Sequence, residues 1–323
     1  MTLQEQIRSN RWHSVLLIGG FIVVILILAG LLAVALNVWL GAFALAGAAV
    51  YAVVGVASSR GMVSSLTGAQ ALPPEQMRPL QRLVENVSIA AGLPVTPEVR
   101  IVDDRAPNAF ATGLTPGKSF VGVTTGLLQT MPKRELEAVI AHEISHVRNR
   151  DTRLMTLAVV FAGVIALVAD IALRTMVFGG GRSKNRGGPI VIVLAVVGFM
   201  LAPIAAMLLR MSLSRRREYL ADATAAEITN DPEGMAMALR RLELDTTTVR
   251  HADSSVAHLW IESPTSRVSD GPTGSSALAG LFDTHPPLQS RIEALEQAGG
   301  FQLPADLAPD RPFIETAGET SAQ

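Results

Sequence analysis

The sequence contains no cysteine among its 323 residues. This absence excludes disulfide bonds, metal sites built from thiolates, and any mechanism with a cysteine nucleophile. It is also typical of proteins that work in a reducing compartment. A metal ion in this chain would therefore have to be bound by histidine and carboxylate side chains.

Charged residues are also scarce, at 17% of the chain, and the 27 basic and 28 acidic residues nearly cancel to a formal charge of -1. No overall field favours nucleic acid, so we expect no nucleic-acid partner. Apolar residues make up 49%, and the mean hydropathy of +0.36 is above that of most soluble domains. The composition indicates a membrane protein, with the lipid bilayer as one of its partners.

Two pairs of hydrophobic runs are long enough for the roughly 20 residues that a membrane-spanning helix requires. Residues 15–36 and 39–57 follow one another so closely that we expect a tight transmembrane hairpin with both ends on one side. The first run is also compatible with a signal peptide, although it is longer than a typical signal core. Residues 154–178 and 190–209 predict a second hairpin, which either spans the membrane or is a buried or interfacial hairpin.

The sequence between these pairs of runs predicts helices and a small sheet. Apolar residues recur at helical spacing over 77–90, and Gly92 and Pro94 end this helix. Pro132 opens a second helix, which continues to about Asp151. Short strands separated by proline and glycine turns are predicted at 99–102, 108–112 and 119–124.

The sequence after the second pair of runs is first helical and then irregular. Residues 214–244 predict one helix, whereas 245–282 are rich in Ser, Thr and Gly and are typical of a loop. Within that loop, residues 258–261 are an apolar, strand-like piece. A short helix follows Pro287 and runs to about Gln297, and the polar end of the chain is predicted to be disordered.

The clearest chemical motif lies inside the helix that Pro132 opens. His142-Glu143-Ile144-Ser145-His146 has the pattern His-Glu-x-x-His. Positions four apart share one face of a helix, so both imidazoles can reach a single zinc ion. Glu143 stands beside the first ligand, where it can hold an activated water and take its proton as general base. The alternative is a pair of surface histidines on a charged helix.

A hydrolytic zinc site has three protein ligands and one open position, so another ligand must come from elsewhere. Glu218 and Asp222 lie four apart on the helix predicted over 214–244. Glu218 could bind zinc there, while Asp222 could accept a hydrogen bond from a ligand histidine. An exposed, charged helix surface is the competing interpretation. The second hairpin favours the site, because it begins near His146 and ends near Glu218.

These patterns predict how the chain is organised. We expect an α+β fold in which a helix-rich, zincin-like metallopeptidase domain with a small β-sheet accompanies two transmembrane hairpins. Residues 1–60 form the N-terminal hairpin, and residues 154–209 form the second one. Residues 61–153 are the first part of the catalytic domain, 210–300 are its second part with the third ligand, and 301–323 are a disordered tail.

Several motifs along the chain occur in the order typical of one family. They are His142-Glu-Ile-Ser-His146 with Asp151, Glu218-Tyr-Leu-Ala-Asp222, Asn108-Ala-Phe-Ala-Thr-Gly113, Thr125-Gly-Leu-Leu128, and Thr284-His-Pro-Pro-Leu288 with Arg291-Ile292. Over residues 10–297 the chain resembles the HtpX family of membrane-bound zinc metalloproteases, which are of gluzincin type. The resemblance implies one zinc ion per chain and the degradation of unfolded or misfolded membrane proteins, as quality control in the stress response.

The resemblance also implies site residues. His142, His146 and Glu218 would be the zinc ligands, and Glu143 would be the base. In related metallopeptidases a histidine of the Thr-His-Pro-Pro motif faces the active site, so His285 could donate a hydrogen bond to the oxyanion of the reaction. A purely structural role of His285 at the turn is equally open.

The stretch from Asn108 to Thr112 could be an edge strand to which an extended peptide adds, rather than an ordinary core strand. This makes Asn108, Ala109 and Phe110 candidate substrate-binding residues. Basic residues flanking the hydrophobic hairpins predict a multi-pass protein of the plasma membrane, in bacteria the inner membrane, with its catalytic domain in the cytoplasm. The alternatives are a non-catalytic, zinc-binding scaffold or chaperone and a CAAX-type prenyl-protein peptidase. The sequence leaves the oligomeric state open.

Overall fold

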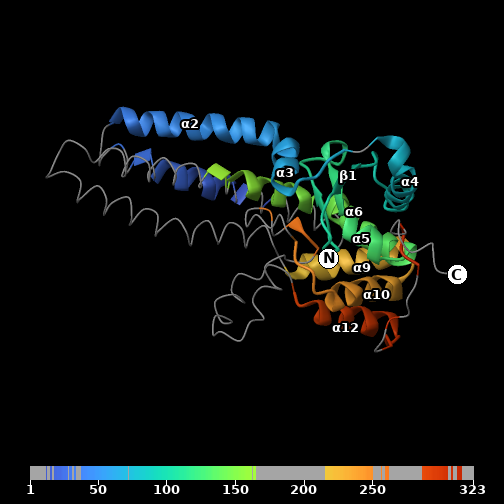
Figure 1. The fold of residues 1–323 in the computed structure, drawn as a ribbon. Coiled ribbons are helices and arrows are strands. Elements are labelled where there is room, and N and C mark those ends of the chain that lie inside the picture. Colours follow the sequence, from blue (N-terminus) through green and yellow to red (C-terminus); the bar gives the residue numbers. More distant parts are fainter. Residues whose placement is uncertain are drawn as a thin grey trace. The chain divides into compact units, whose positions relative to one another are not determined.

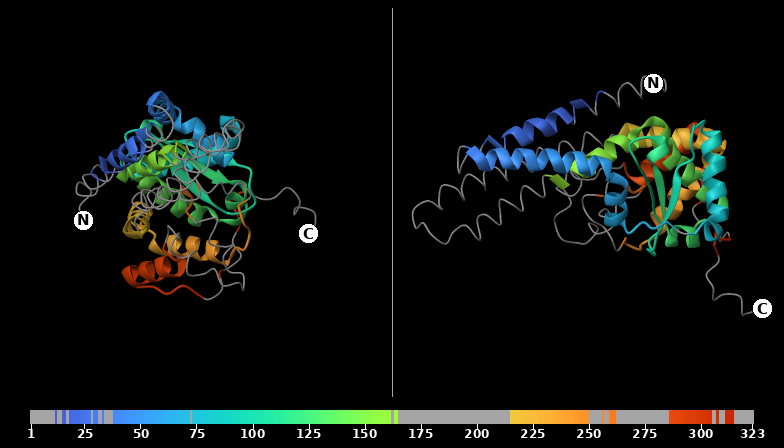
Figure 2. Two further views of the ribbon diagram at one scale, coloured as in Figure 1. Left: turned by 90° about the vertical axis from the view of Figure 1, so that its left-hand side faces the viewer. Right: turned by 90° about the horizontal axis from the view of Figure 1, so that it is seen from above.

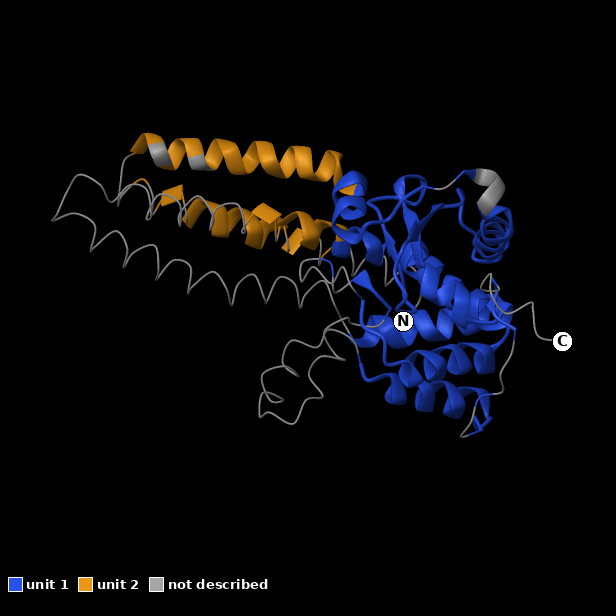
Figure 3. Cartoon of the chain, in the orientation of Figure 1, with its two compact units in different colours: residues 1, 60–155, 213–323 blue, residues 2–59, 156–212 orange. Residues whose placement is uncertain are grey.

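The computed structural model describes residues 12, 15–16, 18–27, 29–30, 33, 38–71, 73–161, 163–164, 215–249, 256, 259–261, 286–304, 307 and 311–314. The chain divides into two compact units, which are coloured separately in Figure 3. Unit 1 is formed mainly by Arg60–Met155 and Leu213–Gln323, and unit 2 by Thr2–Ser59 and Thr156–Ser212. The predicted zinc ligands all lie in unit 1.

Unit 1 contains a three-stranded sheet in the order β1-β3-β2. β1 (Glu98–Val102) pairs parallel with β3 (Phe120–Thr124), and β2 (Ala109–Thr112) pairs antiparallel with β3. Phe110 stands opposite Gly122, where an added Cβ would lie 2.3 Å from the Phe110 ring, so any larger residue would displace the ring. With the helices described below, this sheet confirms the prediction of a helix-rich fold with a small β-sheet.

Two helices and a short 3-10 helix lie next to the sheet in the sequence. α4 (Pro74–Ala90) ends just before Gly92, whose φ of +69° favours glycine. Its apolar side is buried in the core of unit 1, so the helix predicted over 77–90 is confirmed. The short elements η1 (Pro116–Lys118) and α5 (Thr125–Thr130) precede and follow β3.

Helix α6 (Lys133–Asn149) carries the His-Glu-x-x-His motif. Pro132 is its N-cap residue, and Arg150, with φ 61°, ends it in the left-handed conformation. Its apolar residues recur at helical spacing and therefore lie on one face of the helix. This face is buried in the core through Leu136, Ile140 and Ile144. α6 packs against β2 and β3 and also against the helices of the second part of the unit. The motif therefore lies in the interior of unit 1.

The single helix predicted after the second hairpin is in fact two helices, α9 (Arg215–Thr229) and α10 (Pro232–Leu244). Asn230 adopts the left-handed conformation with φ 52°, and the side chain of Asp231 caps α10 by accepting a hydrogen bond from the Gly234 backbone N–H. The prediction of one helix was wrong, because the proline that follows Asp231 lacks the N–H needed to continue a helix and instead starts a new one.

Helix α12 (Leu288–Gly299) packs against α10 and α9, which completes the layer of helices seen in Figures 1 and 2. Its position agrees with the short helix predicted after Pro287. Phe301, Leu303 and Phe313 pack against the core of unit 1, although they belong to the stretch predicted to be disordered. These residues of the C-terminal segment thus have an ordered place in the fold.

Unit 2 contains α2 (Val38–Ala57) and helical residues 18–27. Its interior includes a stacked aromatic pair, Phe21 and Phe161, with ring centroids 4.1 Å apart. These helices fall within the first predicted hairpin. The second predicted hairpin, 154–209, lies largely outside the described residues.

Among the described residues, no single helix is both long enough and apolar enough to cross a membrane. Gly41–Ala57 of α2 and the helix α3 (Ser59–Thr67) pass that test only when they are taken together. Ile18–Ile27 is a shorter apolar helix.

Candidate functional site

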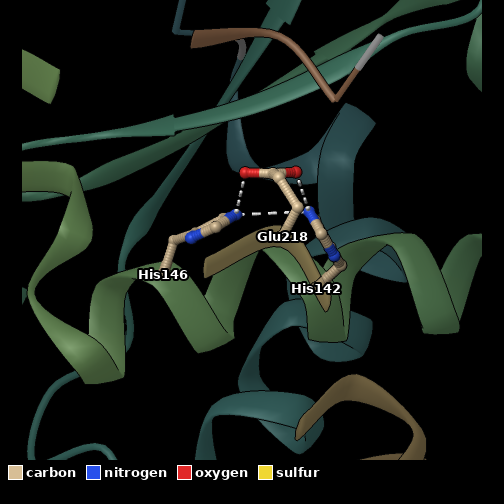
Figure 4. A group of neighbouring side chains, drawn as sticks. All are labelled: His142, His146 and Glu218. Carbon is tan, nitrogen blue, oxygen red and sulfur yellow. Dashed lines mark hydrogen bonds and ion pairs between the residues drawn. The ribbon is translucent and has the colours of Figure 1, made fainter. Parts of the chain in front are cut away.

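Helix α6 presents the two histidines of the motif on one face. His142 and His146 are about one helical turn apart, and both side chains are buried. Their Nε2 atoms lie 3.2 Å apart, and the planes of the two rings differ by 88°. Figure 4 shows that both Nε2 atoms are directed to the same position above the helix.

Helix α9 supplies a third donor group at this position. Glu218 Oε2 lies 3.7 Å from His142 Nε2, and Glu218 Oε1 lies 3.7 Å from His146 Nε2 (Figure 4). The packing of α9 against α6 brings these residues together, although they are far apart in the sequence. The ligand atoms of the three residues lie within 4.8 Å of one another, and all three side chains are buried.

The donor set fits a zinc ion. Zinc binds nitrogen and oxygen at about 2.0–2.2 Å, so two donors of a tetrahedral site are about 3.3–3.6 Å apart. The observed separations of 3.2 Å and 3.7 Å are close to this value. Two imidazoles and one carboxylate are a typical ligand set of hydrolytic zinc, and three protein ligands leave the fourth position open for the reaction.

A buried carboxylate orients His142. Nδ1 of His142 lies 2.9 Å from Asp222 Oδ1, and Asp222 accepts hydrogen bonds from Arg291 Nε at 2.8 Å and Arg291 Nη2 at 2.6 Å. Burial alone would raise the pKa of Asp222, but the charge and hydrogen bonds of Arg291 outweigh burial and lower it. Burial also lowers the pKa of His142, which keeps this imidazole neutral. The ionised Asp222 therefore holds the Nδ1–H tautomer and leaves Nε2 available for a metal.

His146 has a similar arrangement on its other nitrogen. Nδ1 of His146 lies 3.1 Å from Asp151 Oδ2, and Arg217 Nη1 lies 3.9 Å from Asp151 Oδ1. Burial disfavours the charged imidazole, but the hydrogen bond with Asp151 and the charge of Glu218 outweigh burial and raise the pKa of His146 to about 9. In the metal-free protein, a zinc ion must therefore displace a proton from His146.

Glu143 lies beside His142 on α6 and is also buried. Burial raises the pKa of Glu143 to about 7, and the negative charge of Glu218 adds to this shift. The backbone of Ala111 in β2 makes a hydrogen bond to the Glu143 carboxylate. In the zinc-loaded protein the charge of the ion would favour the ionised carboxylate, which is the form that can accept a proton as a general base.

The structure gathers most of the site residues predicted from the sequence into one buried cluster. These are His142, Glu143, His146, Glu218 and Asp222. The candidate substrate-binding residues Asn108, Ala109 and Phe110 lie together at the start of β2, which packs against α6. His285 lies outside the described residues.

Three residues of the cluster make contacts that the sequence does not predict. Asp151 follows the end of α6 and could have been found, because a carboxylate just after a ligand helix is well placed to reach its last histidine. Arg217 directly precedes Glu218. It also stands in a run of arginines, which is typical of an exposed basic cluster. Arg291 had no local signal, because its contact with Asp222 depends on the packing of α12 against α9.

The chain is similar to several known proteins. Residues 74–298 match the model of peptidase family M48. The protease HtpX homolog of Ligilactobacillus salivarius is 39% identical over 306 residues, which cover 91% of this chain and 99% of that protein. The protease HtpX homolog of Listeria innocua is 41% identical over 309 residues, with the same coverage of 91% and 99%. Among solved structures, Ste24p of S. mikatae aligns over 90% of this chain and 67% of that chain, with 18% identity and a TM-score of 0.48.

The matched region includes both the His-Glu-x-x-His helix and the third donor, Glu218. The predictions of a metalloprotease, of zinc as its cofactor and of a likeness to the HtpX family are confirmed. The chain belongs to peptidase family M48, whose members are zinc-dependent metalloproteases.

Proposed function

We propose that this protein is a membrane-bound endopeptidase in which His142, His146 and Glu218 bind zinc and Glu143 is the general base. The proposal is carried by one observation: three buried donors spaced for one zinc ion stand beside the buried carboxyl group of Glu143. A zinc ion kept only for structure would have four closed positions and no need of Glu143. The arrangement therefore favours hydrolysis over a non-catalytic scaffold or chaperone.

The protein groups divide the catalytic work among them. When bound, zinc supplies a Lewis acid that polarises the peptide carbonyl and acidifies a water molecule. Asp222 orients the imidazole of His142. Glu143 takes a proton from the attacking water and delivers it to the nitrogen of the leaving amine. We assign His285 a hydrogen bond to the oxyanion, an assignment that rests on its Thr-His-Pro-Pro motif alone.

The substrate is proposed to be an extended segment of an unfolded or misfolded protein that adds to β2 through Asn108, Ala109 and Phe110. β2 is an edge strand of the sheet. Asn108 pairs with β3, and because backbone groups alternate along a strand, those of Ala109 and Ala111 face away from β3. A peptide paired there would pass close to Glu143, to which the Ala111 backbone already bonds.

Apolar side chains on unit 2 support attachment to a membrane. On α2, Phe43 is 72% exposed, Val53 71% and Val50 63%. Lipid would cover exposed apolar side chains of this kind. Basic residues beside the hydrophobic runs favour a catalytic domain in the cytoplasm. Misfolded proteins of the same membrane would then be within reach, so we propose a role in membrane-protein quality control.

The test is cleavage of casein, an unfolded protein, by the full chain purified in detergent and loaded with zinc. Glu143→Gln is the matched variant, since it keeps the size of the side chain and removes the base. We expect cleavage by the wild-type chain, and we expect Glu143→Gln to reduce it by a factor of at least about 100. A metal chelator should abolish cleavage by the wild-type chain, and added zinc should restore it.

Two results would contradict the proposal. Undiminished cleavage by Glu143→Gln would remove Glu143 as the base. If the wild-type chain binds one zinc ion and cleaves no protein, the non-catalytic scaffold or chaperone would be the better interpretation. Zinc analysis of Glu218→Ala completes the test, because loss of a metal ligand should lower the amount of bound zinc.

A further inference from the structure

The edge of β2 that faces away from β3 is already paired with another part of the chain. Trp260 forms an antiparallel bridge with Phe110, and the backbone N–H of Ile261 donates to the Ala109 carbonyl at 2.9 Å. We call Leu259–Ile261 the edge segment. It lies where a fourth strand of the sheet would lie, and this is also where an extended substrate would add.

A second contact joins the edge segment to the cluster of metal ligands. The carbonyl oxygen of Ile261 accepts a hydrogen bond from Arg291 Nη1 at 3.3 Å. The same Nη1 atom lies 3.6 Å from Glu218 Oε2, and Arg291 also holds Asp222. Ile261 is therefore separated from a proposed zinc ligand by a single arginine side chain, so the edge segment borders the place where a peptide must lie to be cut.

Two further outward groups of β2 are also engaged within the chain. The Ala109 N–H donates to the side-chain oxygen of Asn108 at 3.0 Å, and the Ala111 backbone bonds to Glu143. With the Ala109 carbonyl accepting from Ile261, an incoming peptide meets groups that already have partners. It can add to β2 only by exchanging those partners for its own backbone.

The edge segment is held by packing, but one buried polar atom in it has no hydrogen bond among the described residues. Leu259, Trp260 and Ile261 are all buried, and the Trp260 ring lies 4.7 Å from the Phe110 ring in an edge-to-face arrangement. The indole Nε1 of Trp260 is buried without a hydrogen-bond partner among the described residues. A buried donor without a partner destabilises the arrangement that contains it. The segment is thus held in place, yet less firmly than its burial suggests.

We propose that the edge segment is an autoinhibitory strand, which occupies the backbone-pairing site of the substrate on β2 and must leave before an extended peptide can reach Glu143. The inference rests on the proposed function, because it assigns the same strand edge to substrate. It implies that release of the Ile261 N–H from Ala109 limits peptide binding. Variants that weaken this contact should gain affinity for peptide, and a covalent link across it should block binding.

The first test uses the absence of native cysteine, which makes an introduced pair the only disulfide in the chain. Phe110→Cys and Trp260→Cys face each other across the bridge, at a separation that suits a disulfide. In a Glu143→Gln background, which prevents cleavage, we would measure binding of a labelled casein peptide to the zinc-loaded chain in detergent. The reduced form should bind at least about tenfold more tightly than the oxidised form. The two single-cysteine variants are the matched controls and should be insensitive to oxidation.

A second variant guards against a folding defect in the cysteine pair. Ile261→Pro keeps both aromatic rings but removes the N–H that donates to Ala109. If it melts like the wild-type chain, it should bind the peptide more tightly. Equal binding by the two redox states with the disulfide verified by mass, including no binding by either, would overturn the inference. If peptide binding depends on the disulfide but the wild-type chain cuts no casein, the autoinhibitory strand stands and the proposed peptidase activity fails.

Discussion

The two ligand histidines each contact a buried aspartate, and each aspartate faces an arginine, but the two arrangements differ in strength. Arg291 makes two hydrogen bonds of 2.8 Å and 2.6 Å to Asp222, whereas Arg217 approaches Asp151 only to 3.9 Å. Bidentate, charge-assisted pairs are the stronger kind, and this one is wholly buried. We therefore expect the site to depend more on Arg291 than on Arg217.

Replacing Arg291 by Leu should show this dependence. The change leaves the Asp222 charge buried without its cation, which costs about 3–5 kcal/mol of unfolding free energy. Because Asp222 would no longer be fixed against His142, zinc affinity should also fall by about 10–100-fold. Urea unfolding and competition with a chelating dye measure the two effects. Arg134→Leu is the control, since Arg134 is half exposed and its pair with Asp231 should contribute only about 0–1 kcal/mol. Equal losses in the two variants would contradict the role given to Arg291.

The zinc-free protein should lose stability as the pH rises. The folded-state pKa of His146 is about 9, above its ordinary value, so its contribution is fully present below about pH 6.5 and is lost as the pH passes 9. Glu143, with its pKa raised to about 7, acts in the same direction over a lower range. At about 1.4 kcal/mol per pKa unit, the loss from His146 alone between about pH 6 and pH 10 should be on the order of 3 kcal/mol.

The measurement for this pH dependence is urea unfolding of the chelated protein in detergent at several pH values. Zinc binds the neutral imidazole, so the zinc-loaded protein should lose less stability over the same range. In Asp151→Asn the dependence should be weaker, because Asp151 is the first partner that favours the charged imidazole. A zinc-free protein equally stable at both ends of the range would rule out the raised pKa of His146.

Sequence patterns located the residues of the site that share a helix and missed those that depend on packing. His142, Glu143 and His146 follow from helical periodicity, and Asp222 follows from its spacing to Glu218. Arg291 could not be found in this way, because it comes from a different helix and no spacing rule links it to the site. Buried ion pairs between distant helices are a property of tertiary structure.

At the scale of elements, local chemistry decided what could be predicted. The strands were found close to their observed positions, because proline and glycine turns bound each apolar run. The boundary between α9 and α10 was missed, because the apolar periodicity continues on both sides of it. The cap at Asp231 was the signal that mattered there, since an aspartate followed by proline starts a helix.

The Asp231 cap should contribute measurably to the stability of unit 1. Asp231→Ala removes the acceptor for the Gly234 N–H and also the main partner of Arg134, so unfolding should become easier by about 1–2 kcal/mol. Glu233→Ala is the matched control, because Glu233 contacts the same arginine but does not cap the helix. Thermal and urea unfolding compare the two variants. If Glu233→Ala were as harmful as Asp231→Ala, the ion pairs rather than the cap would explain the effect.

At the scale of the whole molecule, composition indicated the membrane, whereas orientation depends on the distribution of basic residues. Arg8, Arg11 and Arg60 flank the first predicted hairpin, and its turn carries no charge. Basic flanks remain on the cytoplasmic side, so the flanks and the catalytic domain should face the cytoplasm and the turn should face outward. The sequence alone cannot supply the packing of the hairpins, which depends on contacts between helices that are all apolar.

Labelling of single cysteines in intact cells would test this orientation directly, because the chain has no cysteine of its own. Asp103→Cys lies on an exposed position of unit 1, and Val38→Cys lies at the predicted turn, with Val38 66% exposed. A maleimide that does not cross membranes should label Val38→Cys in intact cells and label Asp103→Cys only after the inner membrane is opened. The opposite pattern would place the catalytic domain outside the cytoplasm. It would also remove the argument that misfolded proteins on the cytoplasmic face are the substrates.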